Sequence, residues 1–457
     1  MKKYIVTRPK AKRQTLSFDD VFLDLIDEFK YNRIMHPVNT TTATRVYEVK
    51  SINRSLMNKK TAYQYDTMLR DMVRSLMEFY QRYRHLDIFF DEGYDYEKQF
   101  DTMTQIKLEN RRSGTEMSEH ELDEECERRL GEIGLKFNPY YYTFMIPKHS
   151  GGYRRIDAPV DELKEALREL KQLFEQMMGG NTYHTSAFAY IPKRSCLDLV
   201  QTRFKNNDVR WTLKTDFSDF FGSINYDWAM KQLSHIYPFC EIMELQNGRE
   251  ALMGCMRLCF LSGRLPQGTP ISPMLTNILM IPIDFRLYNG MLKHATDITR
   301  FDKQHDGVNY KLIYSRYADD IYIGSKVGFQ FMDVIEYMKE VLREFDAPFE
   351  IKPQKTKYGS NAGKNFILGY MYNGEGNITL GHKQKKLIKA MINNFALDYK
   401  NNPGNINRAE LYSTLGYMAR LKEVEPGYYE KLIAASNEKY GIDVVERMKD
   451  IAYNRAA

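Results

Sequence analysis

The chain has 457 residues, which at about 150 residues per domain is enough for about three structural units. Hydrophobic residues make up 43% of it and aromatic residues 13%, so the chain can bury a large core and is not expected to be disordered as a whole. The 66 basic side chains exceed the 60 acidic ones, which gives a net charge of +6. An excess this small permits a nucleic-acid partner but does not require one, because binding depends on how the charges cluster.

The five cysteines do not form a metal-binding pattern, since none of them belongs to a CxxC pair. Cys255 and Cys259 are four residues apart in an apolar stretch, which predicts two buried thiols on one helix face rather than a zinc site. The start of the chain is basic without an apolar core, so it does not resemble a signal peptide. No run approaches the ~18 apolar residues of a membrane span. We therefore expect a cytoplasmic protein with reduced cysteines and no membrane contact.

Residues 1–135 are predicted to form a helical, charged N-terminal extension. Apolar side chains recur at helical spacing over residues 69–83, which predicts an amphipathic helix. A second helix is expected to begin at Ser118, where Glu121 three residues later completes a capping box. Residues 111–116 between the two are expected to form a loop.

From about residue 136 the pattern changes to alternating short strands and helices, and this continues to about residue 375. Residues 140–147 alternate and are rich in aromatics, as strands are, and a Gly-Gly pair then predicts a turn. Beyond residue 381 the chain is again predicted to be helical, over 382–400 and 409–424, with a Pro/Gly/Asn-rich loop between them. These elements predict an α+β fold.

Acidic side chains stand at the ends of two predicted strands. A β-compatible run leads into Asp216, and two further such runs flank Ala318, Asp319 and Asp320, which predicts a hairpin with acids at its tip. Adjacent aspartates most often belong to a solvated turn. Here they lie between apolar strands, where two negative charges are costly without a cation. Phosphoryl transfer by two Mg²⁺ ions about 3.5–4 Å apart needs carboxylates from separate strands, and this arrangement predicts such a site.

Three sequence motifs together resemble the reverse transcriptase family: DFSDFF at 216–221, LPQGTPISP at 265–273 and YADD at 317–320. The similarity extends upstream to IPKHSGGYRRIDAPVDELKEAL, from residue 146, and downstream to KPQKTKYGSNAGKNFILGY, from residue 352. The resemblance implies an RNA-directed DNA polymerase with the right-hand polymerase fold, in which an antiparallel sheet forms the palm. Fingers and palm would occupy residues 136–375, and a helical thumb residues 376–457.

The resemblance implies roles for the acidic residues. Asp216 and Asp319 match the metal-bridging aspartates of the family, Asp320 matches the supporting third acid, and the carbonyl of Phe217 is a further candidate ligand. The implied cofactor is a pair of Mg²⁺ ions, for which Mn²⁺ can substitute.

The resemblance also implies residues that contact the incoming nucleotide. Phe221 matches the bulky residue that excludes a ribose 2′-hydroxyl, which favours deoxynucleotides. Gln267 and Gly268 match a turn that lines the nucleotide and template pocket. Lys148 and Arg155 match cations that hold the triphosphate, and Arg154 is an equal candidate for the second of them. Lys355 matches a lysine that protonates the leaving pyrophosphate.

A basic run opens the first predicted thumb helix, and it consists of Lys383, Lys385, Lys386 and Lys389. An exposed helix face is the plain interpretation, whereas a polymerase would use such a face to follow phosphates. The implied partners are an RNA template, a nucleic-acid primer and dNTPs, with a dedicated non-coding RNA or a second copy of the chain as additional candidates.

The motifs depart from those of several subfamilies. Group II intron enzymes carry PQGG where this chain has PQGT, and retron enzymes carry NAxxH and VTG segments that are replaced here by SCLDLVQ and NFILGY. The chain therefore also resembles abortive-infection or defence-associated bacterial reverse transcriptases. Three alternatives stay open. The first is template-independent or protein-primed DNA synthesis, for which Tyr453 is a candidate hydroxyl donor. The second is an RNA-dependent RNA polymerase, which Phe221 disfavours, and the third is a non-catalytic RNA-binding relative.

The apolar stripe of the N-terminal extension must be buried against something, because a helix of this length is marginal by itself. It can pack on the fingers of the same chain, pack on another protomer, or dock a structured RNA beside its arginines. We favour a recognition role over a scaffold, because the fingers and palm motifs look complete from residue 136 onward.

Overall fold

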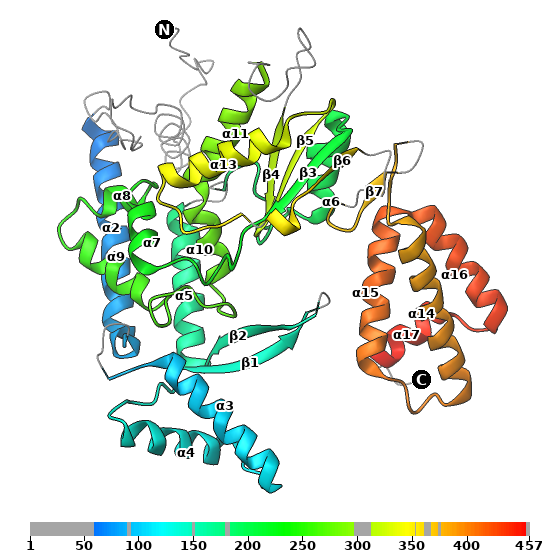
Figure 1. Cartoon of the computed structure of the whole chain (residues 1–457), viewed down its shortest axis with the longest axis horizontal. Coiled ribbons are helices and arrows are strands. Elements are labelled where there is room, and N and C mark those ends of the chain that lie inside the picture. Colours follow the sequence, from blue (N-terminus) through cyan, green and yellow to red (C-terminus); the bar gives the residue numbers. More distant parts are fainter. Residues whose placement is uncertain are drawn as a thin grey trace. The chain divides into compact units, whose positions relative to one another are not determined.

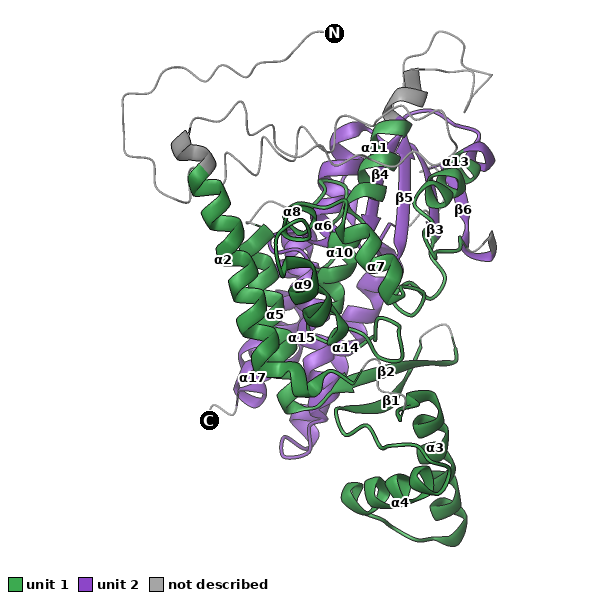
Figure 2. Cartoon of the chain, turned by 90° about the vertical axis from the view of Figure 1, so that its left-hand side faces the viewer, with its two compact units in different colours: residues 1–190, 216–290, 334–352 green, residues 191–215, 291–333, 353–457 purple. Residues whose placement is uncertain are grey.

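The computed structural model describes residues 59–88, 93–148, 151–178, 183–296, 312–351, 353–360, 367–372 and 376–453. The basic start of the chain lies outside the described residues. The chain forms two compact units that alternate along the sequence (Figure 2). Unit 1 consists of residues 1–190, 216–290 and 334–352, and unit 2 of residues 191–215, 291–333 and 353–457.

The N-terminal extension is helical where the structure describes it (Figure 1). Its elements are α2 (Lys59–Tyr83), the 3-10 turn η2 (Arg84–Leu86), α3 (Tyr96–Ser113) and α4 (Glu119–Glu132). The capping box at α4 is confirmed: the Ser118 hydroxyl accepts from the Glu121 N–H, and the Glu121 carboxylate accepts from the Ser118 N–H at 2.7 Å. The sequence did not predict α3, and this helix extends into the expected loop before it ends at Gly114, whose φ is +69°.

The apolar stripe of α2 is buried within the same chain. Leu69 and Leu76 are fully buried, and α2 packs on α5 (Asp161–Met178), α8 (Phe239–Ile242) and α9 (Gly248–Arg257). Polar contacts support this packing: the Tyr80 hydroxyl donates to Asp87, and Arg82 donates to Glu169 of α5 at 2.7 Å. The first of the three alternatives for the stripe is therefore the one observed for α2.

A two-stranded hairpin follows the extension. It consists of β1 (Tyr141–Pro147) and β2 (Tyr153–Pro159), which are antiparallel and in register from Tyr141–Pro159 to Pro147–Tyr153. The strand predicted over 140–147 is thereby confirmed. The tip is a turn in which Gly151 and Gly152 have φ values of +88° and +76°, and the Lys148 N–H donates to the Gly152 carbonyl. Unit 1 also contains α7 (Tyr226–Leu233) and α10 (Ser272–Leu279). Two further helices cross its boundaries: α11 (Ile281–Thr296) begins in unit 1, and α13 (Phe331–Glu344) ends in it.

Unit 2 contains a four-stranded sheet with the strand order β4-β5-β3-β6. Buried apolar side chains such as Leu213, Tyr314 and Ile323 form its core. The strands are β3 (Trp211–Asp216), β4 (Ile313–Tyr317), β5 (Asp320–Ser325) and β6 (Lys357–Ser360). The short helical segments α6 (Cys196–Leu199), η3 (Val200–Phe204) and η4 (Lys205–Asn207) precede β3, and η5 (Pro353–Lys355) precedes β6.

The C-terminal part of unit 2 is a group of four described helices after two short paired strands, β7 (Met371–Tyr372) and β8 (Ile378–Thr379). The two helices predicted here are confirmed as α14 (Gly381–Asn401) and α15 (Arg408–Val424), and they are followed by α16 (Pro426–Tyr440) and α17 (Val444–Ala452). The chain therefore has the expected α+β fold with antiparallel sheets.

Two further expectations concern the cysteines and membranes. Cys255 and Cys259 are both fully buried, as predicted, although α9 ends between them. The Cys259 thiol donates to the Cys255 carbonyl at 3.7 Å. Within the described ranges, none of the helices is long and apolar enough to cross a membrane.

Candidate functional site

The predicted acids lie at one end of the four-stranded sheet. Asp216 is the last residue of β3, and Asp320 is the first residue of β5, where it pairs with Tyr317 of β4. At the opposite end of these strands the Arg210 N–H donates to the Ser325 carbonyl at 2.9 Å, so β3 and β5 run antiparallel. The end of β3 consequently lies beside the start of β5. The hairpin with acids at its tip is confirmed, and Asp319 belongs to its turn.

A buried arginine holds this turn. Ala318 has a φ of +56°, a conformation that residues with a Cβ atom rarely adopt. The Arg316 side chain is completely buried and donates from Nη1 to the Ala318 carbonyl at 3.1 Å. A hydrogen bond from a charged donor is stronger than one between neutral groups. Arg316 therefore stabilises the strained turn that presents Asp319.

Asp320 is paired inside the sheet. The Lys214 ammonium lies 3.0 Å from the Asp320 carboxylate, and the Tyr322 hydroxyl donates to the same carboxylate at 3.3 Å. Lys214 also lies over the Tyr322 ring, 5.1 Å from its centroid. Burial raises the pKa of Tyr322, so its phenol stays protonated and remains a donor. The charge of Asp320 is thus balanced by Lys214 of β3, and its orientation is fixed by that lysine together with Tyr322 of its own strand.

The backbone that follows Asp216 is anchored by aromatic packing in unit 1. Asp216 itself is 3% exposed. The Phe217 ring is buried and stacks on Phe349 with the centroids 4.9 Å apart, and Phe220 packs on the same ring. The Ser218 N–H donates to the Glu350 carbonyl at 2.8 Å. This packing fixes the Phe217 side chain and with it the backbone that carries the candidate carbonyl ligand.

The acids fit a divalent cation in their chemistry, because carboxylate oxygens are the ligands that Mg²⁺ prefers. Asp216 and Asp319 come from two different elements of one sheet end, as a two-metal site requires. Across the part of the chain that the structure describes, however, no three acidic, histidine or cysteine side chains are grouped closely enough to hold an ion. Asp320 is turned toward Lys214.

The turn at Gln267–Gly268 packs directly on β2. The Asp157 N–H donates to the Gln267 carbonyl at 2.9 Å. Gly268 has a φ of +135°, and a Cβ atom there would lie 2.7 Å from the Asp157 carbonyl oxygen. Both the conformation and the close approach require glycine. The two predicted site residues are therefore fixed to the outer edge of the hairpin.

The hairpin separates the two arginines that the sequence left as equal candidates. Arg154 is exposed, as is Lys148 at the tip. Arg155 points to the other face of the strand, where it donates to Glu97 of α3 at 2.7 Å and to Asp157 at 2.9 Å. Only Arg154 thus combines an exposed guanidinium with a position next to the tip.

Phe221 and Lys355 are accessible. Phe221 is half-buried in the turn after Asp216, where its ring meets Phe220 edge to face. Lys355 is exposed, and the next residue, Thr356, shares a hydrogen bond of 3.0 Å with the Thr215 hydroxyl. Lys355 therefore lies at the end of the sheet that carries Asp216.

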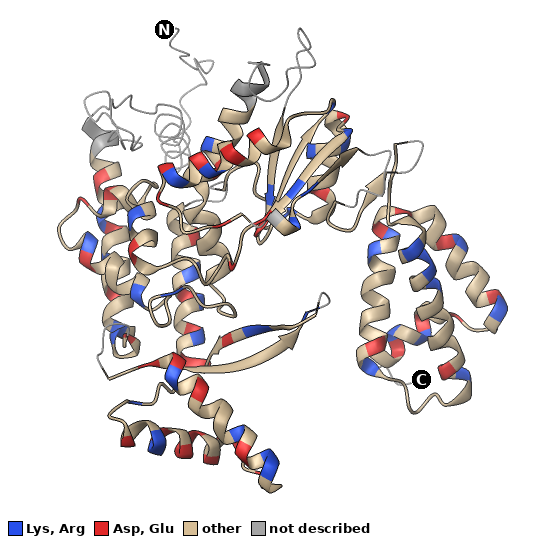
Figure 3. Cartoon of the chain, in the orientation of Figure 1, with Lys and Arg blue, Asp and Glu red and all other residues tan. Residues whose placement is uncertain are grey.

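Figure 3 marks the basic residues of α14 in blue, and the four lysines at its start differ in their surroundings. Lys383, Lys386 and Lys389 are exposed. Lys385 is instead held by the Glu425 carboxylate at 2.8 Å and lies over the Tyr428 ring. Three of the four lysines are thus available to a phosphate backbone, and the fourth joins α14 to the start of α16.

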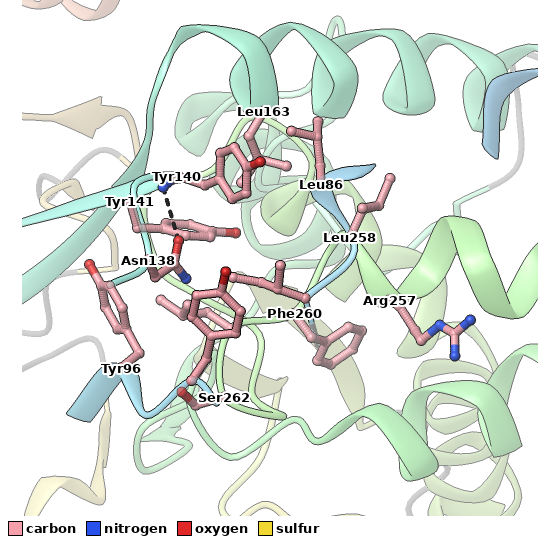
Figure 4. A pocket seen from close by; sticks show the side chains of 13 residues that line it. Leu86, Tyr96, Asn138, Tyr140, Tyr141, Leu163, Arg257, Leu258, Phe260 and Ser262 are labelled. Carbon is pink, nitrogen blue, oxygen red and sulfur yellow. Dashed lines mark hydrogen bonds between the residues drawn. The ribbon is translucent and has the colours of Figure 1, made fainter. Parts of the chain in front are cut away.

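A small cavity in unit 1 lies where the extension meets the start of β1 (Figure 4). Its volume is about 50 Å³, and its lining includes Leu86, Tyr96, Tyr140 and Arg257. Asn138, which also lines it, accepts from the Tyr140 N–H at 2.9 Å. A cavity of this size holds a few water molecules and is too small for a nucleotide. None of the predicted site residues lines it.

Comparison with known proteins identifies the family. The sequence profile described as "Reverse transcriptase (RNA-dependent DNA polymerase)" matches residues 146–375, which is half of the chain. The chain belongs to the reverse transcriptase family. It is an RNA-directed DNA polymerase.

The retron Ec83 reverse transcriptase of Escherichia coli is 24% identical over 334 residues, which cover 70% of this chain and 93% of that protein. The retron Mx65 reverse transcriptase of Myxococcus xanthus is 25% identical over 311 residues, 64% of this chain and 63% of that protein. Among solved structures, apo telomerase from Candida tropicalis matches with a TM-score of 0.37 at 11% identity, covering 69% of this chain and 62% of that one. Retron enzymes are thus among the relatives of this reverse transcriptase.

Sequence reasoning missed Lys214, Tyr322 and Arg316. Alternation along a strand offers a signal for the first, because Lys214 is two residues before Asp216 and points to the same face. Tyr322 is likewise two residues after Asp320. No pattern points to Arg316, since an arginine is rarely buried completely.

Proposed function

We propose that this reverse transcriptase polymerises DNA at the acid-bearing end of the four-stranded sheet, with Asp216, Asp319 and Asp320 as its catalytic carboxylates. The observation that carries the proposal is the placement of these acids at a strand end and at a hairpin tip of one sheet. Strands hold the carboxylates rigidly, and Asp319 and Asp320 at the hairpin tip are half-buried and partly accessible to a ligand. The burial of Asp216 and the support of Asp319 by Arg316 are consistent with a preorganised site.

Asp216, Asp319 and the Phe217 carbonyl would hold two Mg²⁺ ions, with Asp320 in support, and Mn²⁺ can replace them. When bound, these ions lower the pKa of the attacking 3′-hydroxyl and neutralise the leaving pyrophosphate. The residues of the chain orient the reactants. Lys214 balances the charge of Asp320 and keeps it from repelling the other two carboxylates.

We further propose that Arg154 and Lys148 bind the triphosphate of the incoming dNTP. An exposed guanidinium can donate two parallel hydrogen bonds to phosphate oxygens, and Arg155 is already engaged with carboxylates. Gln267 and Gly268 would line the nucleotide pocket, and Phe221 would exclude the 2′-hydroxyl of a ribonucleotide. Lys355, exposed at the same sheet end as Asp216, would protonate the pyrophosphate.

The nucleic-acid partners would be an RNA template and a primer, held in part by Lys383, Lys386 and Lys389 of α14. The retron relatives favour a retron-like role. We propose in addition that the enzyme uses a dedicated non-coding RNA and acts in bacterial anti-phage defence. A second candidate is protein-primed synthesis, because the Tyr453 side chain next to the C-terminus of α17 is 65% exposed.

The test is the double substitution Asp319→Asn with Asp320→Asn, which keeps the side-chain shapes and removes two charges. Mg²⁺-dependent incorporation of dNTPs on a primed RNA template should fall at least about 1000-fold, because the metal ligands are lost. Asp346→Asn, at an exposed position in unit 1, serves as the control and should keep full activity. Near-normal synthesis by the double variant would refute the assignment of the site.

A further inference from the structure

We infer that Arg155 is a positioning residue, through which helix α3 of the N-terminal extension holds the hairpin β1–β2 and the Gln267–Gly268 turn in place. This inference rests on the proposed function, because it takes the hairpin as the carrier of the triphosphate-binding Arg154. By resemblance to the family, Arg155 and Arg154 are equal candidates for binding the triphosphate. The contacts of Arg155 with α3 and with Asp157 instead indicate a structural role.

The guanidinium of Arg155 is engaged on several sides. It donates from Nη1 to Glu97 of α3 at 2.7 Å and from Nε to Asp157 of β2 at 2.9 Å. It also lies over the ring of Phe100, another α3 residue, 4.4 Å from the centroid. The side chain is 25% exposed. A guanidinium covered by an aromatic ring and paired with two carboxylates would have to break these contacts to bind a phosphate.

The contacts of α3 reach both strands of the hairpin. The Asp157 carboxylate accepts from the Thr143 hydroxyl of β1 at 2.6 Å, and the Thr143 hydroxyl also shares a hydrogen bond of 2.8 Å with Tyr96 of α3. Just before β1, the Gln99 side chain donates to the Asn138 carbonyl and accepts from the Asn138 N–H, at 2.9 and 2.7 Å. Gln99 and Asn138 are both buried. Helix α3 therefore contacts the segment just before β1 and the face of the hairpin that carries Thr143, Arg155 and Asp157.

The other face of the hairpin is exposed near the tip. Side chains alternate along a strand, so Arg154 points away from α3 when Arg155 points toward it. Tyr142, Phe144 and Ile146 share the face of Arg154 by register and are 55%, 41% and 44% exposed. A two-stranded hairpin is marginally stable by itself. The contacts with α3 thus help to hold the face that carries Arg154 in one orientation.

The pair formed by Arg155 and Asp157 is also connected to the Gln267–Gly268 turn. Asp157, which Arg155 and Thr143 hold through its side chain, donates from its backbone to Gln267, and Gly268 packs against its carbonyl. A shift of β2 would therefore displace Gln267 and Gly268 as well. The network runs from Glu97 through Arg155 and Asp157 to the turn, entirely within unit 1.

The experiment uses the full-length chain and measures kcat and the dNTP KM on a homopolymeric RNA template with an annealed DNA primer. Glu97→Gln removes the charge that holds Arg155 without altering any group proposed to meet the substrate. We expect it to raise the KM about fivefold and to leave kcat at saturating dNTP within about twofold, because the site is displaced but its chemistry is intact. Arg155→Lys keeps the ion pair and should restore most of the affinity that Arg155→Ala loses.

A double-substitution comparison completes the test, because residues in one network are not additive whereas independent ones are. Glu97→Gln combined with Arg155→Ala should be no worse than Arg155→Ala alone, because both remove the same ion pair. Glu97→Gln combined with Arg154→Ala should show less than the product of both effects, because Glu97 acts in part through the position of Arg154, whereas Glu97→Gln combined with the unrelated Asp346→Asn should show the product. An unchanged or lowered KM in Glu97→Gln would overturn the inference and return Arg155 to the substrate. That result would leave the proposed site intact, since the site is judged by the Asp319→Asn, Asp320→Asn enzyme.

Discussion

The acid-bearing end of the sheet and the hairpin β1–β2 are both proposed to act on the same nucleotide, yet they are supported differently. The turn of Asp319 is held from within its own sheet, by the buried Arg316, and Asp320 is held by Lys214 of the adjacent strand β3 and by Tyr322 of its own strand β5. The hairpin has no such interior and is held from outside by α3. The groups proposed to bind metal ions at Asp319 and Asp320 are therefore placed by contacts within one sheet, whereas the projecting arm proposed to bind phosphate needs a partner element.

The largest effect is expected when the support inside the sheet, the buried side chain of Arg316, is removed. Arg316→Met keeps most of the volume but leaves the Ala318 carbonyl without its charged donor. We expect a loss of about 2 kcal/mol in the free energy of unfolding and a fall of about 100-fold in polymerase activity. Denaturant unfolding and primer extension measure the two. Arg343→Met, whose side chain is 68% exposed, should change neither, and an equally active, equally stable Arg316→Met enzyme would contradict the role of the buried arginine.

The contact between the hairpin and the nucleotide turn can be broken at Gly268. Gly268→Ala forces a Cβ atom toward the Asp157 carbonyl and a side chain into a positive-φ conformation, so the dNTP KM should rise about 10-fold. Steady-state kinetics on a primed RNA template measure this. Gly416→Ala in α15, where a Cβ atom would meet nothing within 4 Å, should leave the KM unchanged and slightly raise the stability. Equal behaviour of the two variants would show that the turn does not line the site.

A third substitution tests the sugar-excluding role proposed for Phe221. Phe221→Ala should open space for a 2′-hydroxyl and raise the ratio of rNTP to dNTP incorporation about 10-fold, chiefly through the kcat/KM of the ribonucleotide. Phe221→Tyr keeps the bulk and should retain the discrimination. A ratio that does not move in Phe221→Ala would place the exclusion of ribonucleotides elsewhere.

The smallest expected effect concerns α14, where three lysines are exposed and one is committed to the fold. Replacing Lys383, Lys386 and Lys389 with Gln should reduce the slope of log affinity against log salt by about 2, because phosphate contacts release counterions. Lys385→Gln should leave that slope unchanged and lower the melting temperature, since it removes the partner of Glu425. Binding of a primed RNA template at several salt concentrations measures the slope. An unaltered slope in the triple variant would exclude this face from nucleic-acid binding.

Local signals carried much of the sequence-based prediction. The Ser118–Glu121 capping box and the hairpin tip at Asp319 depend on neighbouring residues, and the structure confirms both. The choice between Arg154 and Arg155 could not be made from sequence, because it depends on which strand face α3 covers. Glu97 is 58 residues away from Arg155 along the chain, and the mostly polar α3 gave no apolar stripe to indicate its presence. Of the three alternatives given for the apolar stripe of the extension, the structure shows packing within the same chain for α2, and the recognition role of the extension stays a prediction.

The hydrogen bond between Asp157 and Gln267 is formed by backbone groups alone. Every residue except proline carries the same N–H group, and every residue carries the same carbonyl. A systematic replacement of side chains at position 267 therefore cannot remove this bond, however thorough the set of variants. Tolerance at that position would reflect the chemistry of the bond and would not mean that the hairpin and the turn are independent.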